Sequence, residues 1–171
     1  MKQVWLLLSI LILSGCATTH SPIPDNYNGP TSTIGSTDKR HSASKADIFF
    51  LYKVNGKLID NSLGASRSAT YGQGFSLTTS HITTAVPSSE PITLTLMGRT
   101  VYAAPVQTLS GTVYEITGDL TFTPTPDVRY VVKGTLGADY SAVWVEEIET
   151  GKVIESKIET YENTELGFFE K

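Results

Sequence analysis

One stretch of the sequence decides the expected fold: residues 129–158 read RYVVKGTLGADYSAVWVEEIETGKVIESKI. Three short runs within it, residues 129–133, 141–146 and 153–158, are rich in β-branched and aromatic residues, and segments that contain glycine separate them. Runs of this length between turn residues are typical of β-strands that pair as hairpins. The stretch therefore predicts three consecutive antiparallel strands.

The same pattern of short apolar runs and turn residues occurs earlier in the chain. The predicted strands and turns are Ile48–Tyr52 before Asn55-Gly56, Ile92–Leu96 and Thr100–Ala103 around Met97-Gly98-Arg99, and Val113–Ile116 and Leu120–Thr123 around Gly118-Asp119. No stretch shows a sustained helical period of apolar residues. We expect an all-β domain, either an antiparallel β-sandwich or a small closed β-barrel of about seven or eight short strands.

The segment 60–90 differs from its surroundings because it contains few charged residues and many Ser, Thr, Gly and Ala residues. It is about twice as long as the 12 to 15 residues beyond which structureless loops become uncommon. Phe75 and Leu77 alternate with hydroxyl side chains, which predicts a strand with flexible flanks. The alternative is a recognition site, and its expected contacts are the long polar side chains of the segment: Arg67, Tyr71, Gln73 and His81.

The first sixteen residues have the organisation of an export signal. Met1-Lys2-Gln3 carries one positive side chain, and the apolar run Val4–Leu13 follows it, with Ser9 as its one polar residue. This run is too short for a transmembrane helix, which needs about 20 residues. The run ends in Leu13-Ser14-Gly15-Cys16, which resembles the lipobox of bacterial lipoproteins.

The resemblance implies that residues 1–15 are a lipoprotein signal peptide and that Cys16 receives a diacylglyceryl group and becomes the acylated N-terminus. Lipid on Cys16 would attach the mature chain to a membrane, since two or more acyl chains anchor a protein stably. In Gram-negative lipoproteins, a residue such as Ala17 after the cysteine, in place of Asp, implies the periplasmic face of the outer membrane. Cys16 is the only cysteine, so no disulfide is expected within one copy of the chain.

Composition predicts a flexible tether over residues 16–45 and a β-rich globular domain over residues 46–171. The tether is rich in Ser, Thr, Pro, Gly and Asn and contains few bulky apolar residues. Such a segment cannot bury a core and is typical of disorder. His20 and His41 lie in it, and we expect them to be solvated and not to bind a metal.

Charge and motifs argue against several classes of function. Cleavage would remove Lys2 and leave 12 basic and 17 acidic residues, a formal charge of −5, so neither nucleic acid nor another anionic partner is expected. No metal and no cofactor is predicted, because the domain lacks cysteines, paired histidines and a phosphate-binding glycine motif. His81 is the only histidine of the predicted domain, and no serine hydrolase motif surrounds it.

Two functions remain open. The first is a non-catalytic module that binds or scaffolds an envelope protein, peptidoglycan or another surface polymer, which suits a lipid-anchored β domain without catalytic motifs. The second is an envelope hydrolase assembled around His81, because the members of a Ser-His-Asp triad need only be close in space. A carboxylate and a serine hydroxyl within hydrogen-bond reach of His81 would favour the hydrolase.

Overall fold

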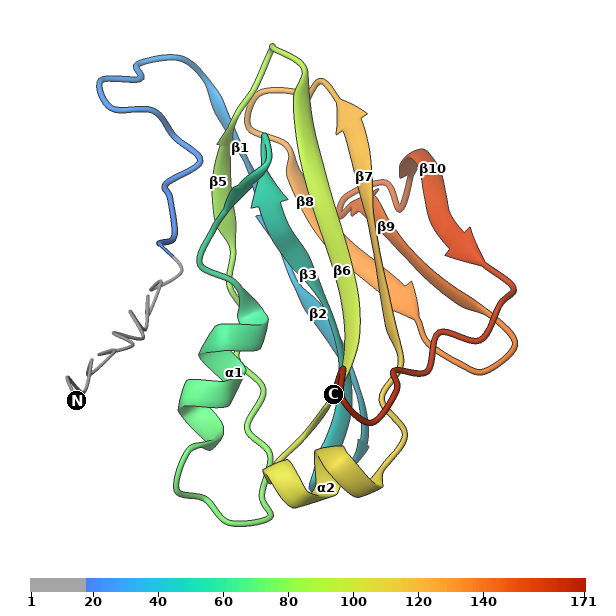
Figure 1. Ribbon diagram of the computed structural model, residues 1–171. Helices are drawn as coiled ribbons and strands as arrows, with labels where there is room; N and C mark the ends of the chain where they lie inside the picture. Colours follow the sequence, from blue (N-terminus) through green and yellow to red (C-terminus); the bar gives the residue numbers. More distant parts are fainter. Residues whose placement is uncertain (1–17) are drawn as a thin grey trace, which may run out of the picture.

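The computed structural model describes residues 18–171, which form ten β-strands and two short α-helices (Figure 1). The predicted signal peptide, Cys16 and Ala17 lie outside the described residues. Strands make up most of the regular structure, as the sequence predicted. Neither of the described helices is long and apolar enough to cross a lipid bilayer.

The first sheet has five strands in the order β10, β9, β8, β1 and β5. Their bounds are β10 Val153–Thr160, β9 Ser141–Glu147, β8 Arg129–Thr135, β1 Thr31–Gly35 and β5 Thr84–Pro87. All neighbours run antiparallel except β1 and β8, which are parallel, with Thr33 opposite Arg129. Strands β8, β9 and β10 are the three that residues 129–158 predicted, and Gly151 turns between the last two with a φ of 70°.

The second sheet has the order β2, β3, β6 and β7, and the short strand β4 pairs with β3. Their bounds are β2 Thr37–Ser42, β3 Lys45–Val54, β4 Lys57–Leu58, β6 Ile92–Tyr102 and β7 Glu115–Phe122. The two sheets stay separate and do not close into one barrel, so the arrangement is compatible with a β-sandwich. The described residues form ten strands, more than the seven or eight expected.

The main hydrophobic core lies between the two sheets. It collects buried side chains from both, such as Phe49 and Leu96 from the second sheet and Val132 from the first. Strand β3 is also buried on its other face, where Ile48 and Phe50 belong to a second, smaller cluster. Because both faces of β3 are covered, its sequence is a continuous apolar run and does not alternate with polar residues.

The turns predicted around Gly98 and Gly118 are wrong, because β6 and β7 run through these positions as continuous strands. The two glycines allow close packing instead. A Cβ atom on Gly98 would lie 2.9 Å from the Phe49 ring, and a Cβ atom on Gly118 would lie 2.7 Å from the Ile158 side chain of β10. Both positions therefore lack a side chain because a neighbouring large one occupies the space.

The tether predicted over residues 16–45 is too long, because β1 and β2 lie within it. Ile34 of β1 is only 1% exposed and belongs to the main core. Strand β1 lies between β8 and β5, so ladder hydrogen bonds on both sides hold it in the sheet. A strand held in this way can be rich in Ser and Thr, a composition that by itself indicates disorder.

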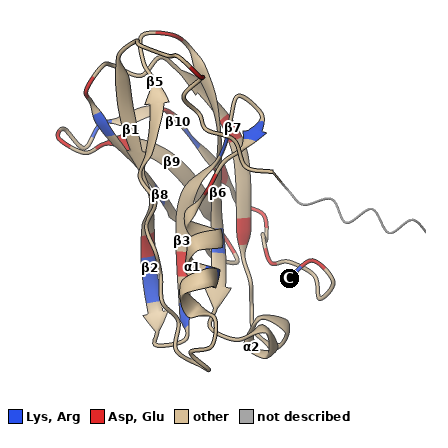
Figure 2. Cartoon of the chain, turned by 90° about the vertical axis from the view of Figure 1, so that its left-hand side faces the viewer, with Lys and Arg blue, Asp and Glu red and all other residues tan. Residues whose placement is uncertain are grey.

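Two helices lie outside the second sheet, and the sequence predicted neither of them. Helix α1, Ser62–Thr70, begins after Asn61, whose side chain accepts a hydrogen bond from the N–H of Gly64. Helix α2, Pro105–Ser110, begins with a proline, which suits the first helical position. In the view of Figure 2, α1 lies in front of β3 and α2 lies at the lower end of the molecule.

Hydrogen bonds from hydroxyl side chains hold the segment after α1 against the helix. Three buried hydroxyl residues of α1 are four positions apart and therefore lie on one face. Their oxygens accept hydrogen bonds from alternate backbone N–H groups of the segment. The pairs are Ser62 with Ile82, Ser66 with Ser80 and Thr70 with Thr78, at 2.9, 2.9 and 3.0 Å. The strand predicted around Phe75 and Leu77 does not form, and the hydroxyl side chains of α1 hold the backbone of this segment instead.

Candidate functional site

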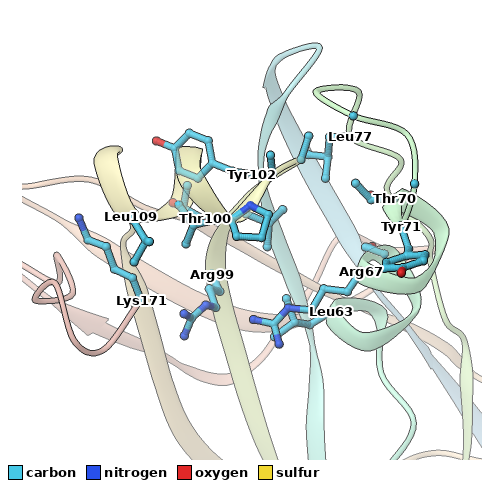
Figure 3. Close-up of a pocket in the computed structure, with 18 residues that line it drawn as sticks. Leu63, Arg67, Thr70, Tyr71, Leu77, Arg99, Thr100, Tyr102, Leu109 and Lys171 are labelled. Atoms are coloured by element: carbon cyan, nitrogen blue, oxygen red, sulfur yellow. The ribbon is translucent and has the colours of Figure 1, made fainter.

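A cavity of about 680 Å³ opens between α1, α2 and the end of β6 (Figure 3), and we call it the α1–α2 pocket. Its size is in the range of pockets that hold small ligands. Most of its wall is hydrocarbon, from the side chains of Leu63, Leu77, Val101, Ala103, Pro105 and Leu109. Leu77 and Val101 also belong to the smaller cluster on the outer face of β3. The pocket is therefore the part of that apolar face which the helices leave uncovered.

Three cationic side chains border the α1–α2 pocket: Arg67, Arg99 and Lys171. Arg99 is paired with Glu115, and Lys171 Nζ lies 3.8 Å from the carboxylate of Glu165. Arg67 has no ion-pair partner among residues 18–171. Burial and then the positive charge of Arg99 lower the pKa of Arg67 below its ordinary value. An anion in the pocket would relieve this repulsion.

The charge of the pocket differs from the charge of the chain as a whole. The chain is acidic, with a formal net charge of −4, and its Lys and Arg residues are scattered over several elements (Figure 2). At the pocket, however, the two positive charges of Arg67 and Arg99 are balanced by a single carboxylate, that of Glu115, which pairs with Arg99. The expectation that anionic partners are disfavoured follows from the net charge and does not describe this pocket.

The structure divides the four residues of the predicted recognition site between different places. Arg67 and Tyr71 border the α1–α2 pocket, and Tyr71 is 91% exposed. The amide of Gln73 braces its own loop, since its nitrogen donates to the backbone oxygen of Ala69 and its oxygen accepts from Thr78. His81 does not line this pocket. Two of the four predicted contacts, Arg67 and Tyr71, therefore lie at the same cavity.

His81 forms a second polar cluster, with Asp38 of β2 and with Ser36, the residue between β1 and β2. Its Nε2 lies 2.9 Å from the Asp38 carboxylate, and its Nδ1 lies 3.4 Å from Ser36 Oγ. A neutral imidazole that donates from Nε2 to Asp38 keeps Nδ1 free to accept the proton of Ser36. The order of contacts is that of a Ser-His-Asp triad, but the two imidazole nitrogens are exchanged, because in the triad Nδ1 faces the carboxylate and Nε2 faces the serine.

The surroundings of this cluster are less suited to catalysis than the pairwise distances suggest. Ser36 Oγ lies 2.6 Å from Ser62 Oγ, which is closer than its distance to His81 and ties it to the hydroxyl residues that dock α1. The His81 side chain is 46% exposed. None of Ser36, Asp38 and His81 borders the α1–α2 pocket. A substrate held in that pocket is therefore not presented to the cluster.

Sequence reasoning missed most of the residues that shape these two places. Arg99 was expected in a turn, and Ser36 and Asp38 were expected in the tether, so none of them was a candidate. Arg99 could have been found if Gly98 had been recognised as a strand residue. Arg99 would then stand out as a long cationic side chain inside a mostly apolar strand. No local signal joins Asp38 to His81, because the two are 43 positions apart and meet only through tertiary structure.

Among residues 18–171, one other histidine lies beside a carboxylate. His41 Nε2 lies 2.7 Å from the Asp47 carboxylate, so this histidine is not a solvated linker residue as predicted. Asp47 is buried, and its other oxygen accepts a hydrogen bond from Thr100 Oγ1 at 2.7 Å. In the described part of the chain, no three His, Cys, Asp or Glu residues are grouped in a way that would hold a metal ion.

Comparisons with known proteins found no matching family model, no matching curated protein and no matching solved structure. The features of the chain that bear on its function are the lipobox-like segment, the α1–α2 pocket and the His81 cluster.

Proposed function

We propose that this chain is a lipid-anchored envelope protein, attached through Cys16, whose β domain is a non-catalytic module that binds an envelope component in the α1–α2 pocket. The lipobox-like segment Leu13-Ser14-Gly15-Cys16 supports the anchor. Ala17 supports the periplasmic face of the outer membrane as the final location. Lipid on Cys16 would keep the pocket close to the membrane surface.

The observation that carries the binding function is an apolar cavity with an unpartnered cation at its border. Pockets for small ligands are mostly apolar and contain a few polar groups that fix the orientation of the ligand. The α1–α2 pocket has this composition, with Arg67 as the polar group that lacks an ion-pair partner among residues 18–171. Exposed apolar side chains also lie on its border, such as Tyr71 and Leu109.

The anchor is tested by Cys16→Ser in the full-length precursor, expressed in a bacterium that processes lipoproteins. We expect the precursor to stay uncut and to incorporate no labelled palmitate, because the acceptor thiol is lost. The control is Ala17→Asp, which keeps Cys16 and should be processed and acylated but retained in the inner membrane. Normal cleavage and membrane attachment of the Cys16→Ser protein would contradict the lipoprotein assignment.

The pocket is tested with Nile red, a neutral dye that fluoresces when it enters an apolar site. The sample is the unacylated mature chain, residues 16–171 with Cys16→Ser, which contains every residue that the structure describes. We expect Thr108→Phe to abolish most of the fluorescence increase, because Thr108 of α2 lines the pocket and the larger side chain would fill it. Ser110→Phe on the same helix lies outside the pocket lining and serves as the matched control. Equal fluorescence in both variants would reject this pocket as the binding site.

The His81 cluster supports a second candidate function, an envelope hydrolase. In it, Ser36 Oγ would attack an acyl carbon as its proton passes through His81 Nδ1 to the leaving group, and water would then hydrolyse the ester on Ser36. The observation in its favour is the approach of both Asp38 and Ser36 to His81. We rank it second because the cluster is exposed and because Ser36 is bonded to Ser62.

A fluorophosphonate probe separates the two candidates, because it reacts covalently with activated serine nucleophiles. The binding function predicts no labelling of the unacylated mature chain. The hydrolase predicts labelling that disappears in Ser36→Ala and in His81→Gln and persists in Thr83→Ala, a nearby control that leaves Ser36, Asp38 and His81 unchanged. Labelling with this pattern would make the hydrolase the better assignment.

A further inference from the structure

The side chains of Arg67 and Arg99 come from different elements and meet beside the α1–α2 pocket. Arg67 projects from α1 and Arg99 from β6, and their guanidinium groups extend into the same region of the site (Figure 3). Glu115 of β7 lies opposite Arg99 in the sheet and is paired with it. This group of three side chains therefore carries one more positive charge than negative charge.

Four of the hydroxyl side chains that line the pocket already have partners inside the protein. Ser66 and Thr70 bond the segment after α1, Thr100 bonds Asp47, and the Tyr102 hydroxyl donates to the backbone oxygen of Thr112. A ligand therefore meets hydrocarbon over most of the wall, one cation that lacks an anionic partner, and the hydroxyl groups of Tyr71 and Thr108. The many amide groups of a peptide, or hydroxyl groups of a sugar, would find few hydrogen-bond partners there, which makes their desolvation unfavourable.

We propose that the α1–α2 pocket binds a long-chain carboxylate, with the alkyl chain against the apolar wall and the carboxylate on the guanidinium groups of Arg67 and Arg99. This inference rests on the binding function proposed above and names its ligand class. A guanidinium group matches a carboxylate in a planar, two-bond geometry. A singly charged head group neutralises the single excess charge, whereas a doubly charged phosphate monoester would leave one negative charge without a partner beside the apolar wall.

Isothermal titration of the unacylated mature chain with dodecanoate and with dodecanol tests the proposal, both below the concentrations at which they aggregate. The two probes share an alkyl chain and differ in the head group. We expect dodecanoate to bind about tenfold more tightly, since a charged hydrogen-bonded pair is worth roughly one factor of ten or more in affinity. Dodecyl phosphate should bind more weakly than dodecanoate at a pH where it is doubly charged.

Arg67→Met separates the head-group contact from the apolar contact, because methionine keeps much of the length of the side chain and removes the charge. We expect this variant to lose about tenfold in affinity for dodecanoate and to bind dodecanol unchanged. The matched control is Arg129→Met, which removes an exposed arginine of β8 that is paired with Glu149 outside the pocket. This control should bind both probes as the parent chain does.

The outcomes distinguish the ligand class from the binding function itself. Equal affinity for dodecanoate and dodecanol, or a preference for dodecyl phosphate, would overturn the carboxylate assignment while Nile red binding still supported the pocket. Dodecanoate binding that survives Thr108→Phe would place the carboxylate elsewhere and overturn the proposal. Failure of all probes, including Nile red, would reject the binding function together with its ligand.

Discussion

The two faces of strand β3 differ in how completely they are covered. The inner face contributes Phe49 and Leu51 to the main core, where the opposite sheet closes over them. The outer face contributes Ile48 and Phe50 to the smaller cluster, which also contains Leu77 from the segment after α1 and against which Leu63 of α1 packs. The inner face is a closed core, and the outer face ends in an open pocket.

This difference shows where a small β domain can form a ligand site. A second sheet presents a broad apolar surface and leaves little space against its partner. Two short helices cannot cover an eleven-residue strand such as β6 over its full length, so part of its outer face stays accessible. Arg67 and Arg99 lie beside this uncovered part, which is why the candidate site combines apolar walls with positive charge.

The largest expected effect comes from opening the closed face. Phe49→Ala should lower the free energy of unfolding by about 3 to 5 kcal/mol, because the ring is 2% exposed and packs against Gly98 and Gly134 on two different strands. Urea denaturation of the unacylated mature chain measures this change. Phe169→Ala is the control, since its ring is 98% exposed and its loss should change stability by less than about 0.5 kcal/mol. Similar costs for both substitutions would contradict a closed core around Phe49.

A smaller effect is expected on the outer face. Phe50→Ala should lower the free energy of unfolding by about 2 to 3 kcal/mol, although the ring is only 1% exposed. The cost is lower because neighbouring side chains can relax into the new space from the adjoining pocket, which reduces the cavity that remains. The same urea experiment, run in parallel with Phe49→Ala, gives the difference. If Phe50→Ala is as costly as Phe49→Ala, the contrast between an open and a closed face is wrong.

The smallest effect concerns the glycine that admits the Phe49 ring. Gly98→Ala should cost about 1 to 2 kcal/mol, because the new methyl group would lie 2.9 Å from that ring and 3.3 Å from Ile116. Gly64→Ala in α1 is the matched control, since only Asn61 Oδ1 at 3.9 Å lies near the new methyl group. Gly64 lies in the first turn of α1, and alanine there should raise stability by up to about 1 kcal/mol, because it restricts the unfolded chain. A neutral Gly98→Ala would mean that the strand tolerates a side chain at this position.

Part of the fold could be predicted because the signals are local. Strands β8, β9 and β10 follow from short apolar runs between turn residues, and the turn after β3 follows from Asn55-Gly56. Both turn residues adopt positive φ, 48° and 76°, which Asn and Gly allow at low cost. The lipobox-like segment is also a linear pattern, and Arg67 and Tyr71 were chosen from the sequence as long side chains among small ones.

The remaining features depended on residues that are distant in the chain. Glycines in β6 and β7 resemble turn residues until Phe49 and Ile158 are known to fill the space beside them. Strand β1 resembles a linker until β8 and β5 supply its ladder hydrogen bonds, and α1 lacks an apolar period because its buried face consists of hydroxyl residues that bond residues 78–82.

The sequence by itself determined the strand-rich composition, the turns at Asn55-Gly56 and Gly151, and the motif at Cys16, because each of these depends on residues that are neighbours in the chain. Tertiary structure alone decided where the sheets leave space and which charges meet there. Arg67 and Arg99 come together because α1 packs on the outer face of the second sheet, and His81 reaches Asp38 because the same helix docks the segment that carries it. Burial and charge pairing arise between segments that are far apart in sequence, so no pattern of neighbouring residues encodes them.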